Sequence, residues 1–236
     1  MQSDVTHLAI QDQLLTWFEK NKRPALWGAV VVAVIGFAGG IYEWKQYQVQ
    51  MDASEALSKI ANGSLAGGAQ AGTPEAFLKV TTDYPGTDAA KRALLIAAGN
   101  LFAEGKYKDA QTQFERFLRD YRDSALATEA LFGVAASKDA QGLTDEAVAA
   151  YKDIVDHHAS ESVAPQVRFE LGRLYEAQNK LELARDLYQQ VAQIDPNGQL
   201  GSEATMRLAE LFAKNPNLIP ARPASAMPGT LNLGKP

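Results

Sequence analysis

A repeat of 37 residues is the feature that most restricts how this chain of 236 residues can fold. The segments that begin at Ala98, Ala135 and Gly172 align without a gap at that offset. Each contains a Gly or Asn, then an alanine, then an aromatic residue: Gly105, Gly142 and Asn179; Ala110, Ala147 and Ala184; Phe114, Tyr151 and Tyr188. Such self-similarity is typical of solenoids, in which a unit buries its apolar face only against neighbouring units.

Each unit is predicted to contain two helices. Apolar residues fall at i, i+3, i+4 and i+7 on both sides of the Gly or Asn, which tolerates a positive φ in a turn. A weaker unit comes first, since Gly68, Phe77 and Tyr84 stand one period before Gly105, Phe114 and Tyr121. The sequence therefore predicts an all-α fold with an α-solenoid of period 37 over residues 51–214 and turns at Gly68, Gly105, Gly142 and Asn179.

An uncharged run of nineteen residues, PALWGAVVVAVIGFAGGIY, occupies positions 24–42. A helix needs about 20 apolar residues to cross a bilayer. Cations precede the run at Lys20, Lys22 and Arg23, and this bias favours a cytoplasmic N-terminus. Aromatic residues flank it, including Trp27 and Trp44, as expected at headgroup depth. We predict a single transmembrane helix over residues 24–44, preceded by a cytoplasmic segment over residues 1–23.

Two alternatives to the anchor remain open. The run could be a cleaved signal peptide, because residues 36–38, Gly-Phe-Ala, form a passable cleavage site. Three acids in the preceding segment and the length of the run weigh against this alternative. The run could also be a buried core helix, but such a helix would need a large core around it. An anchor predicts a single-pass protein of the bacterial inner membrane, with its repeats on the extracytoplasmic, periplasmic side.

Composition points away from catalysis and nucleic-acid binding. The chain carries 23 basic and 28 acidic residues, a net charge of −5, which argues against a nucleic-acid surface. It has no cysteine, and its histidines are His7, His157 and His158, a spacing that gives no metal pair on one helix face. Phosphate-loop and serine-nucleophile patterns are missing. We expect no enzyme activity, metal, cofactor or small-molecule substrate; an envelope enzyme is the alternative from another class.

The repeats resemble the tetratricopeptide repeat family. The resemblance is carried by Leu94, Ala97, Ala98, Gly105, Ala110, Phe114 and Phe117, by Leu131, Val134, Ala135, Gly142, Ala147, Tyr151 and Ile154, and by Leu171, Gly172, Tyr175, Ala184, Tyr188, Val191 and Pro196. The period departs from the family's usual length of about 34 residues. Arg168 stands where a large apolar residue is usual, and Lys138 where an aromatic is usual.

This resemblance implies that the first helix of each unit lines a groove for a protein partner. The implied groove residues are Arg92, Leu95, Gly99, Phe102, Glu129, Phe132, Ala136, Asp139, Gln166, Phe169, Arg173 and Glu176, with Met206 one period after Phe169. An apolar row, Leu95, Phe132, Phe169 and Met206, is either a track for extended polypeptide or packing between units. The Lys and Asn of the family's carboxylate clamp are absent, so chaperone C-terminal tails are poor candidates.

Two further features are open to two interpretations each. Gly36 and Gly40 form a small-xxx-small face that permits helix docking in a membrane, although glycine is common in membrane helices. Residues 217–236 are rich in proline and lack periodicity, so we predict a disordered tail, with a partner-binding motif as the alternative.

The order of segments is similar to that of the YfgM-like ancillary subunits of the bacterial SecYEG translocon. The stretch QLLTWFEKNKRPALWG, residues 13–28, resembles the entry of that family into its membrane segment. This resemblance implies a scaffold whose partners are the SecYEG translocon, periplasmic chaperones or exported polypeptides. An envelope-assembly scaffold without a translocon link is the alternative.

Overall fold

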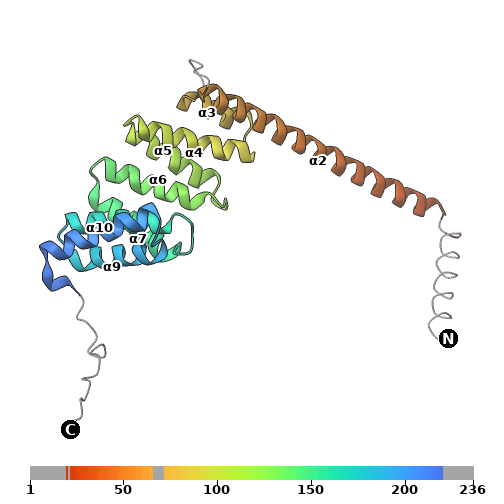
Figure 1. Ribbon diagram of the computed structural model, residues 1–236. Helices are drawn as coiled ribbons and strands as arrows, with labels where there is room; N and C mark the ends of the chain where they lie inside the picture. The colour runs from red at the N-terminus through yellow and green to blue at the C-terminus, as the bar shows by residue number, and fades with distance from the viewer. Residues whose placement is uncertain (1–19, 21, 66–71, 220–236) are drawn as a thin grey trace, which may run out of the picture.

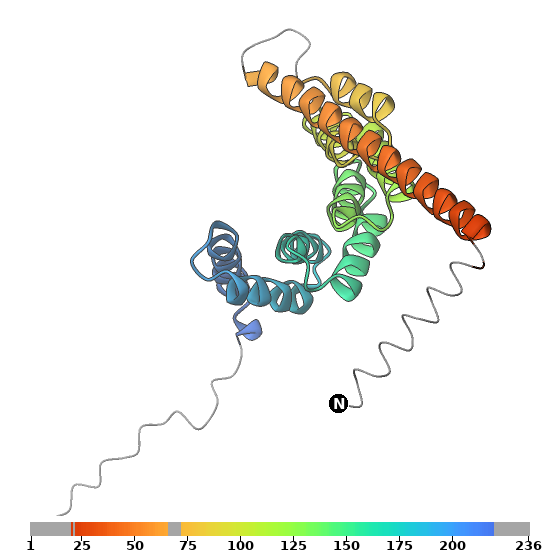
Figure 2. The same ribbon diagram turned by 90° about the vertical axis from the view of Figure 1, so that its right-hand side faces the viewer.

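The computed structural model describes residues 20, 22–65 and 72–219, and within these ranges all regular secondary structure is helical. The helices are α2 (Lys22–Leu65), α3 (Pro74–Asp83), α4 (Asp88–Ala103), α5 (Tyr107–Asp120), α6 (Ala127–Ala140), α7 (Thr144–His157), α8 (Ala164–Ala177), α9 (Leu181–Ile194), α10 (Gln199–Lys214) and the 3-10 helix η1 (Pro216–Leu218). Helices α3 to α10 pack in chain order, and α2 extends away from them (Figure 1). Turned by 90°, the stack follows a curved path (Figure 2). The predicted all-α repeat fold is confirmed.

Three of the predicted turns have the backbone that their residues favour. Gly105, Gly142 and Asn179 have φ values of 78°, 77° and 57°. This left-handed region costs a residue with a Cβ about 1–2 kcal/mol, which explains the two glycines and the tolerant asparagine. The fourth predicted turn, at Gly68, lies outside the described residues.

Small residues and aromatic rings alternate inside the stack as the repeat predicts. Ala110, Ala147 and Ala184 are fully buried. At Gly133 a Cβ would stand 2.5 Å from the ring of Phe114, closer than side chains pack, so helix α6 approaches α5 only because that position is glycine. The small residues that recur with the 37-residue period therefore lie where successive helices approach one another closely.

Arg168 and Lys138, the two departures from the family pattern, have different surroundings. Arg168 is buried, and its Nη2 donates a hydrogen bond to the carbonyl oxygen of Ala159 at 3.3 Å, in the connection before α8. Lys138 is half-buried, and its ammonium lies 3.0 Å from Glu146 on α7. Each cation therefore ties its own helix to the neighbouring segment by a polar contact instead of an apolar one.

Helix α2 continues across the predicted boundary between the membrane helix and the repeat domain. We predicted a membrane helix at 24–44 and a repeat domain from residue 51, yet both belong to one helix of 44 residues. The joining stretch 45–50, KQYQVQ, contains neither Gly nor Pro, so nothing in it ends a helix. Beyond it, Ala53 is buried, and Leu57 and Ile60 pack against the cluster around Phe77. The end of α2 is thus the first helix of the first unit.

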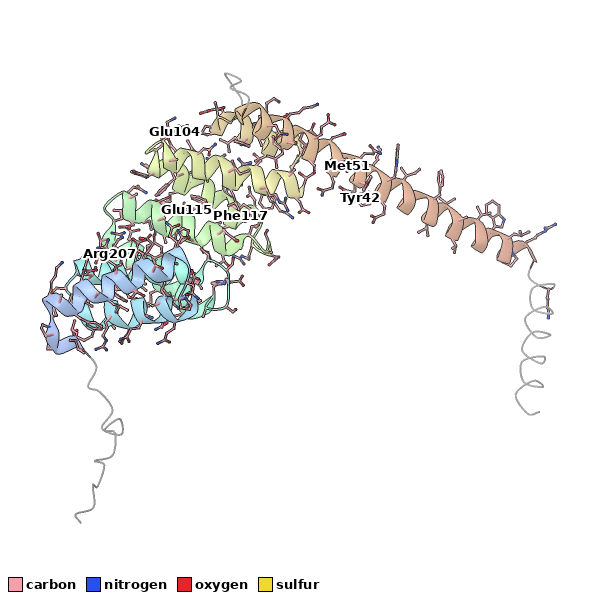
Figure 3. The ribbon with its side chains drawn as sticks, viewed as in Figure 1. Tyr42, Met51, Glu104, Glu115, Phe117 and Arg207 are labelled. Carbon is pink, nitrogen blue, oxygen red and sulfur yellow. The ribbon has the colours of Figure 1, made fainter. Side chains whose placement is uncertain are left out.

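The N-terminal part of α2 contacts no other described helix. Trp27 and Phe37 are 72% and 73% exposed, and Tyr42 stands clear of the stack in Figure 3. Among the described helices α2 is the one that is long and apolar enough to cross a membrane. The candidate span, Leu26–Gly63, contains an 18-residue window with a mean hydropathy of 1.7, none of it buried. Length and composition are therefore compatible with a membrane span.

The end of the stack is longer than we predicted. Residues 217–219 were assigned to a disordered tail, but Leu218 lies in η1 and is buried. Its carbonyl oxygen accepts a hydrogen bond from Nη1 of Arg185 on α9 at 3.4 Å. A single apolar residue that reaches the last helix pair is enough to order this turn, and periodicity gives no sign of it. The remaining tail, residues 220–236, lies outside the described residues.

Candidate functional site

A cavity of about 470 Å³ lies among α4, α6, α7 and α8. Its lining residues are Phe102, Phe132, Ala136, Asp139, Ala140, Tyr151, Gln166, Glu170 and Arg173. Binding pockets in proteins commonly measure about 300–1,000 Å³ and combine an apolar lining with a few polar groups. Six of the thirteen predicted groove residues are therefore brought to one place: Phe102, Phe132, Ala136, Asp139, Gln166 and Arg173.

Aromatic side chains form the apolar part of this cavity. The rings of Phe132 on α6 and Tyr151 on α7 have centroids 5.9 Å apart in a tilted arrangement. Phe102, on α4, packs edge to face with Tyr107 at 5.1 Å. Tyr151 is fully buried, whereas Phe102 and Phe132 are half-buried. The two phenylalanines therefore both support the stack and present ring surface to the cavity.

An ion-pair network forms the polar rim. Arg173 on α8 donates from Nη2 to Asp139 on α6, and from Nε to Oε2 of Glu170 at 3.0 Å. All three side chains are partly exposed. Burial lowers the pKa of Arg173, but the hydrogen bond and charge of Glu170 and the charge of Asp139 outweigh it, and the pKa is raised. Arg173 is thus a permanent cation that links two consecutive units.

The two carboxylates also act on the neighbouring phenol. The pKa of Tyr151 is raised, first because burial disfavours the phenolate and then because Glu170 and Asp139 are negative. Its hydroxyl therefore keeps its proton at neutral pH. The charges that surround the cavity repel a further negative charge even at this buried position.

The members of the apolar row have different environments. Leu95 and Phe132 are half-buried against the cores of their units. Phe169 is buried, with its ring 5.4 Å from that of Tyr188, and does not line the cavity. Met206, on the last helix of the stack, is 61% exposed. Equal register does not give equal surroundings, because no further helix pair packs on α10 among the described residues.

The remaining candidate residues lie outside this cavity. Arg92 lines a second cavity, of about 350 Å³, between α2 and α4. Glu129 is half-buried on α6, and its Oε2 has no hydrogen-bond partner among the described residues. Glu176 accepts a hydrogen bond from the hydroxyl of Tyr188 at 3.0 Å, and Gly99 is exposed. These four predicted groove residues therefore do not line the cavity among α4, α6, α7 and α8.

Gly36 and Gly40, for which helix docking was predicted, border an apolar hollow on α2 with Phe37, Ile41 and Trp44. A Cβ at either glycine would meet nothing within 4 Å. Any packing role of these glycines would thus need a partner beyond the described chain.

Sequence reasoning missed three lining residues of the cavity. Glu170 is four residues after Gln166 and three before Arg173, a helical spacing that could have identified it. Ala140 directly follows Asp139 at the end of α6. Tyr151 was assigned to repeat packing alone, and only the side chains around it reveal its second role.

Comparison with known proteins identifies the family. The model of the tetratricopeptide repeat-like domain family matches residues 16–193, well over half of the chain. The chain belongs to this family. The match begins before the repeats and includes all of α2, so α2 is part of the family's pattern. None of the curated proteins compared with the chain matches it significantly.

Solved structures resemble the repeats in fold. A variant of the nearly identical TPR-like repeats from Podosopora anserina is 16% identical, with a TM-score of 0.50, and the match covers 73% of this chain and 87% of that one. PcrH from Pseudomonas aeruginosa is 18% identical, with a TM-score of 0.47 over 53% of this chain and 94% of its own. The type III secretion translocator chaperone SycD from Yersinia enterocolitica is 19% identical, with a TM-score of 0.46 over 54% and 87%. At these identities the likeness concerns the fold alone.

Proposed function

We propose that this protein is a membrane-anchored scaffold that holds extended polypeptide in the cavity among α4, α6, α7 and α8. The observation that carries the proposal is the cavity itself, in which aromatic surface lies beside hydrogen-bonding groups of Gln166, Asp139 and Arg173. Extended polypeptide offers both apolar side chains and unpaired backbone groups, and each part of the lining suits one of these. Tetratricopeptide repeats typically serve protein interaction.

In this proposal the anchor holds the scaffold at the bacterial inner membrane. Residues 1–23 are then cytoplasmic, residues 24–44 span the membrane and the repeats are periplasmic. The exposed apolar part of α2 and the cations at Lys20, Lys22 and Arg23 support this orientation. Because α2 is continuous, Ala53, where it packs into the repeats, would stand roughly 13 Å beyond residue 44 at a rise of about 1.5 Å per residue.

We propose, further, that the clients are polypeptides emerging from the membrane and that the scaffold is an ancillary component of the SecYEG translocon and the periplasmic chaperone network. The short, rigid connection through α2 supports this proposal, since it would keep the cavity close to the membrane surface. The similarity of residues 13–28 to the YfgM-like subunits supports it independently.

Site-specific photo-crosslinking in intact membranes tests this function. A photoreactive residue replaces Gln166, which is exposed and lines the cavity, in the full-length chain. We expect adducts with exported polypeptides or translocon subunits. The matched control replaces Glu182, which is exposed on α9 and does not line the cavity. Adducts of equal yield from both positions, or adducts only within the protein itself, would exclude the cavity as the site of contact.

A further inference from the structure

We infer that the cavity selects polypeptide segments in which a large apolar side chain adjoins a lysine or arginine. This inference rests on the proposed function and specifies the chemistry of the client. It follows from three properties of the lining: its aromatic surface, its net charge and the hydrogen bonds that its arginine, Arg173, already makes.

The aromatic surface of the cavity can bury the apolar side chain of the bound polypeptide. Phe102 and Phe132 are half-buried and lie on two different helices, and the rings line one cavity together with Ala136 and Ala140. Burial of an apolar side chain is worth about 25 cal/mol per Å² of surface removed from water. Because the cavity is bordered by polar groups, an isolated apolar side chain would not use all of it.

The net charge provides for the cation. Among the lining residues Asp139 and Glu170 are negative and Arg173 is positive, which leaves one negative charge. Glu129 adds a further carboxylate on α6, one helical turn before Phe132, and its Oε2 is buried without a hydrogen-bond partner among the described residues. The pKa of Tyr151 is raised first by burial and then by the charges of Glu170 and Asp139, the same two carboxylates.

The hydrogen bonds that Arg173 already makes to two carboxylates disfavour an anionic ligand. The Arg173 guanidinium already donates to both Asp139 and Glu170, so a ligand carboxylate that bound its remaining N–H groups would lie beside two other negative charges. A ligand cation meets no such repulsion, and both carboxylates can accept further hydrogen bonds, because an ionised carboxylate offers about four acceptor positions and each accepts one hydrogen bond from Arg173 here. The geometry thus favours a cation beside the apolar side chain.

Binding of three matched peptides to the full-length protein in detergent micelles tests the inference. The peptides are GSGKFKGSG, GSGEFEGSG and GSGKAKGSG, each capped at both ends and carrying an uncharged fluorophore, and binding is measured by fluorescence anisotropy. We expect the first to bind at least about tenfold more tightly than either of the others at low salt. The advantage over the glutamate peptide is expected to shrink at high salt, where charges are screened.

Single substitutions locate the effect. Asp139→Asn and Glu170→Gln are each expected to weaken binding of the lysine peptide by about three- to fivefold, because each removes one attracting charge. Arg173→Gln is expected to strengthen it by a similar factor, since it leaves both carboxylates free. Glu115→Gln serves as the control: it removes a charge that is exposed on α5, outside the cavity, and leaves binding unchanged.

Three outcomes would overturn the inference: equal or tighter binding of the glutamate peptide, loss of lysine-peptide binding in Arg173→Gln, or no binding of any of the three. If Arg173→Gln lowers the thermal midpoint, Asp139→Asn and Glu170→Gln still decide the question. Crosslinks from Gln166 to exported chains would leave the scaffold function standing in each case. If those crosslinks were absent and the peptides showed the expected preference, the proposed clients would be wrong, but the inferred chemistry of the ligand would stand.

Discussion

Two phenylalanines show how differently the two regions of this chain use apolar residues. Phe117, on α5, is fully buried and packs edge to face with Tyr121, with ring centroids 5.4 Å apart. Phe37, on α2, is 73% exposed. In the repeats apolar residues leave water by packing on one another, whereas no other described part of the chain covers the first half of α2. A long uncharged helix in this condition needs another apolar environment, and a bilayer provides one.

The largest expected effect comes from truncating the buried ring of Phe117, and the same truncation of the exposed ring of Phe37 is the comparison. We expect Phe117→Ala to destabilise the repeats by about 3–5 kcal/mol, because it leaves a cavity in a packed core. Phe37→Ala is expected to leave the thermal midpoint of the repeats unchanged, since its ring touches none of them. Thermal unfolding of the full-length protein in detergent, followed by circular dichroism, measures both. A comparable loss in the two variants would show that the first half of α2 packs on the repeats.

A charged residue placed in the apolar run of α2 tests whether this run lies in a bilayer. Val34→Asp is expected to oppose membrane insertion by about 2.5–3.5 kcal/mol if Val34 lies near the bilayer centre. The expected result is a shift of the protein from the membrane pellet to the soluble fraction on alkaline carbonate extraction. The control, Gln48→Asp, lies outside the predicted span and should remain in the pellet. Retention of Val34→Asp at the level of the control would argue against the anchor, and release of the unsubstituted chain with a new N-terminus near Gly39 would indicate a signal peptide.

Overpacking tests the small positions of the repeats. Ala147 is fully buried, and it lies one helical turn before Tyr151. We expect Ala147→Leu to lower the free energy of unfolding by about 1–3 kcal/mol, because a larger side chain has no space there. Ala149→Leu, at an exposed position of the same helix, is the matched control for helix propensity. Equal unfolding free energies in denaturant titration would place Ala147 at the surface.

The smallest expected effect concerns a turn between the helices of one unit. Gly142 has a φ of 77°, so Gly142→Ala should cost about 1–2 kcal/mol through backbone strain. No side chain needs to move, since a Cβ there would meet nothing within 4 Å. Asn179→Gly, at the corresponding turn of the next unit, should not destabilise the fold by strain. A neutral Gly142→Ala in the same titration would mean that the turn can change its conformation without cost.

Much of the candidate site followed from the sequence because the repeat fixes register. The family resemblance implied that Phe132, Asp139 and Arg173 line one groove, and all three line one cavity. Spacing alone does not distinguish an exposed position from a packed one. Phe169 occupies the same register as Phe132 yet is buried against Tyr188, because the surroundings of each unit differ.

The sequence by itself determined the periodic features: the helix pairs, the turns at Gly105, Gly142 and Asn179, and the buried alanines. These depend on local backbone preference and on contacts that recur with each unit, so a single unit already encodes them. It also identified the apolar run through its length and lack of charge.

Only the tertiary structure decided the features that depend on contacts between units. The sharing of Arg173 between Asp139 and Glu170, the second role of Tyr151 and the burial of Leu218 all involve residues from different helices. The continuity of α2 belongs with them, because its final turns are held by packing on Phe77 and not by a signal of their own. The spacing of Glu170 and Arg173 on α8 was visible in the sequence, but side-chain contacts between different helices have no period, and therefore no pattern in the sequence indicates them.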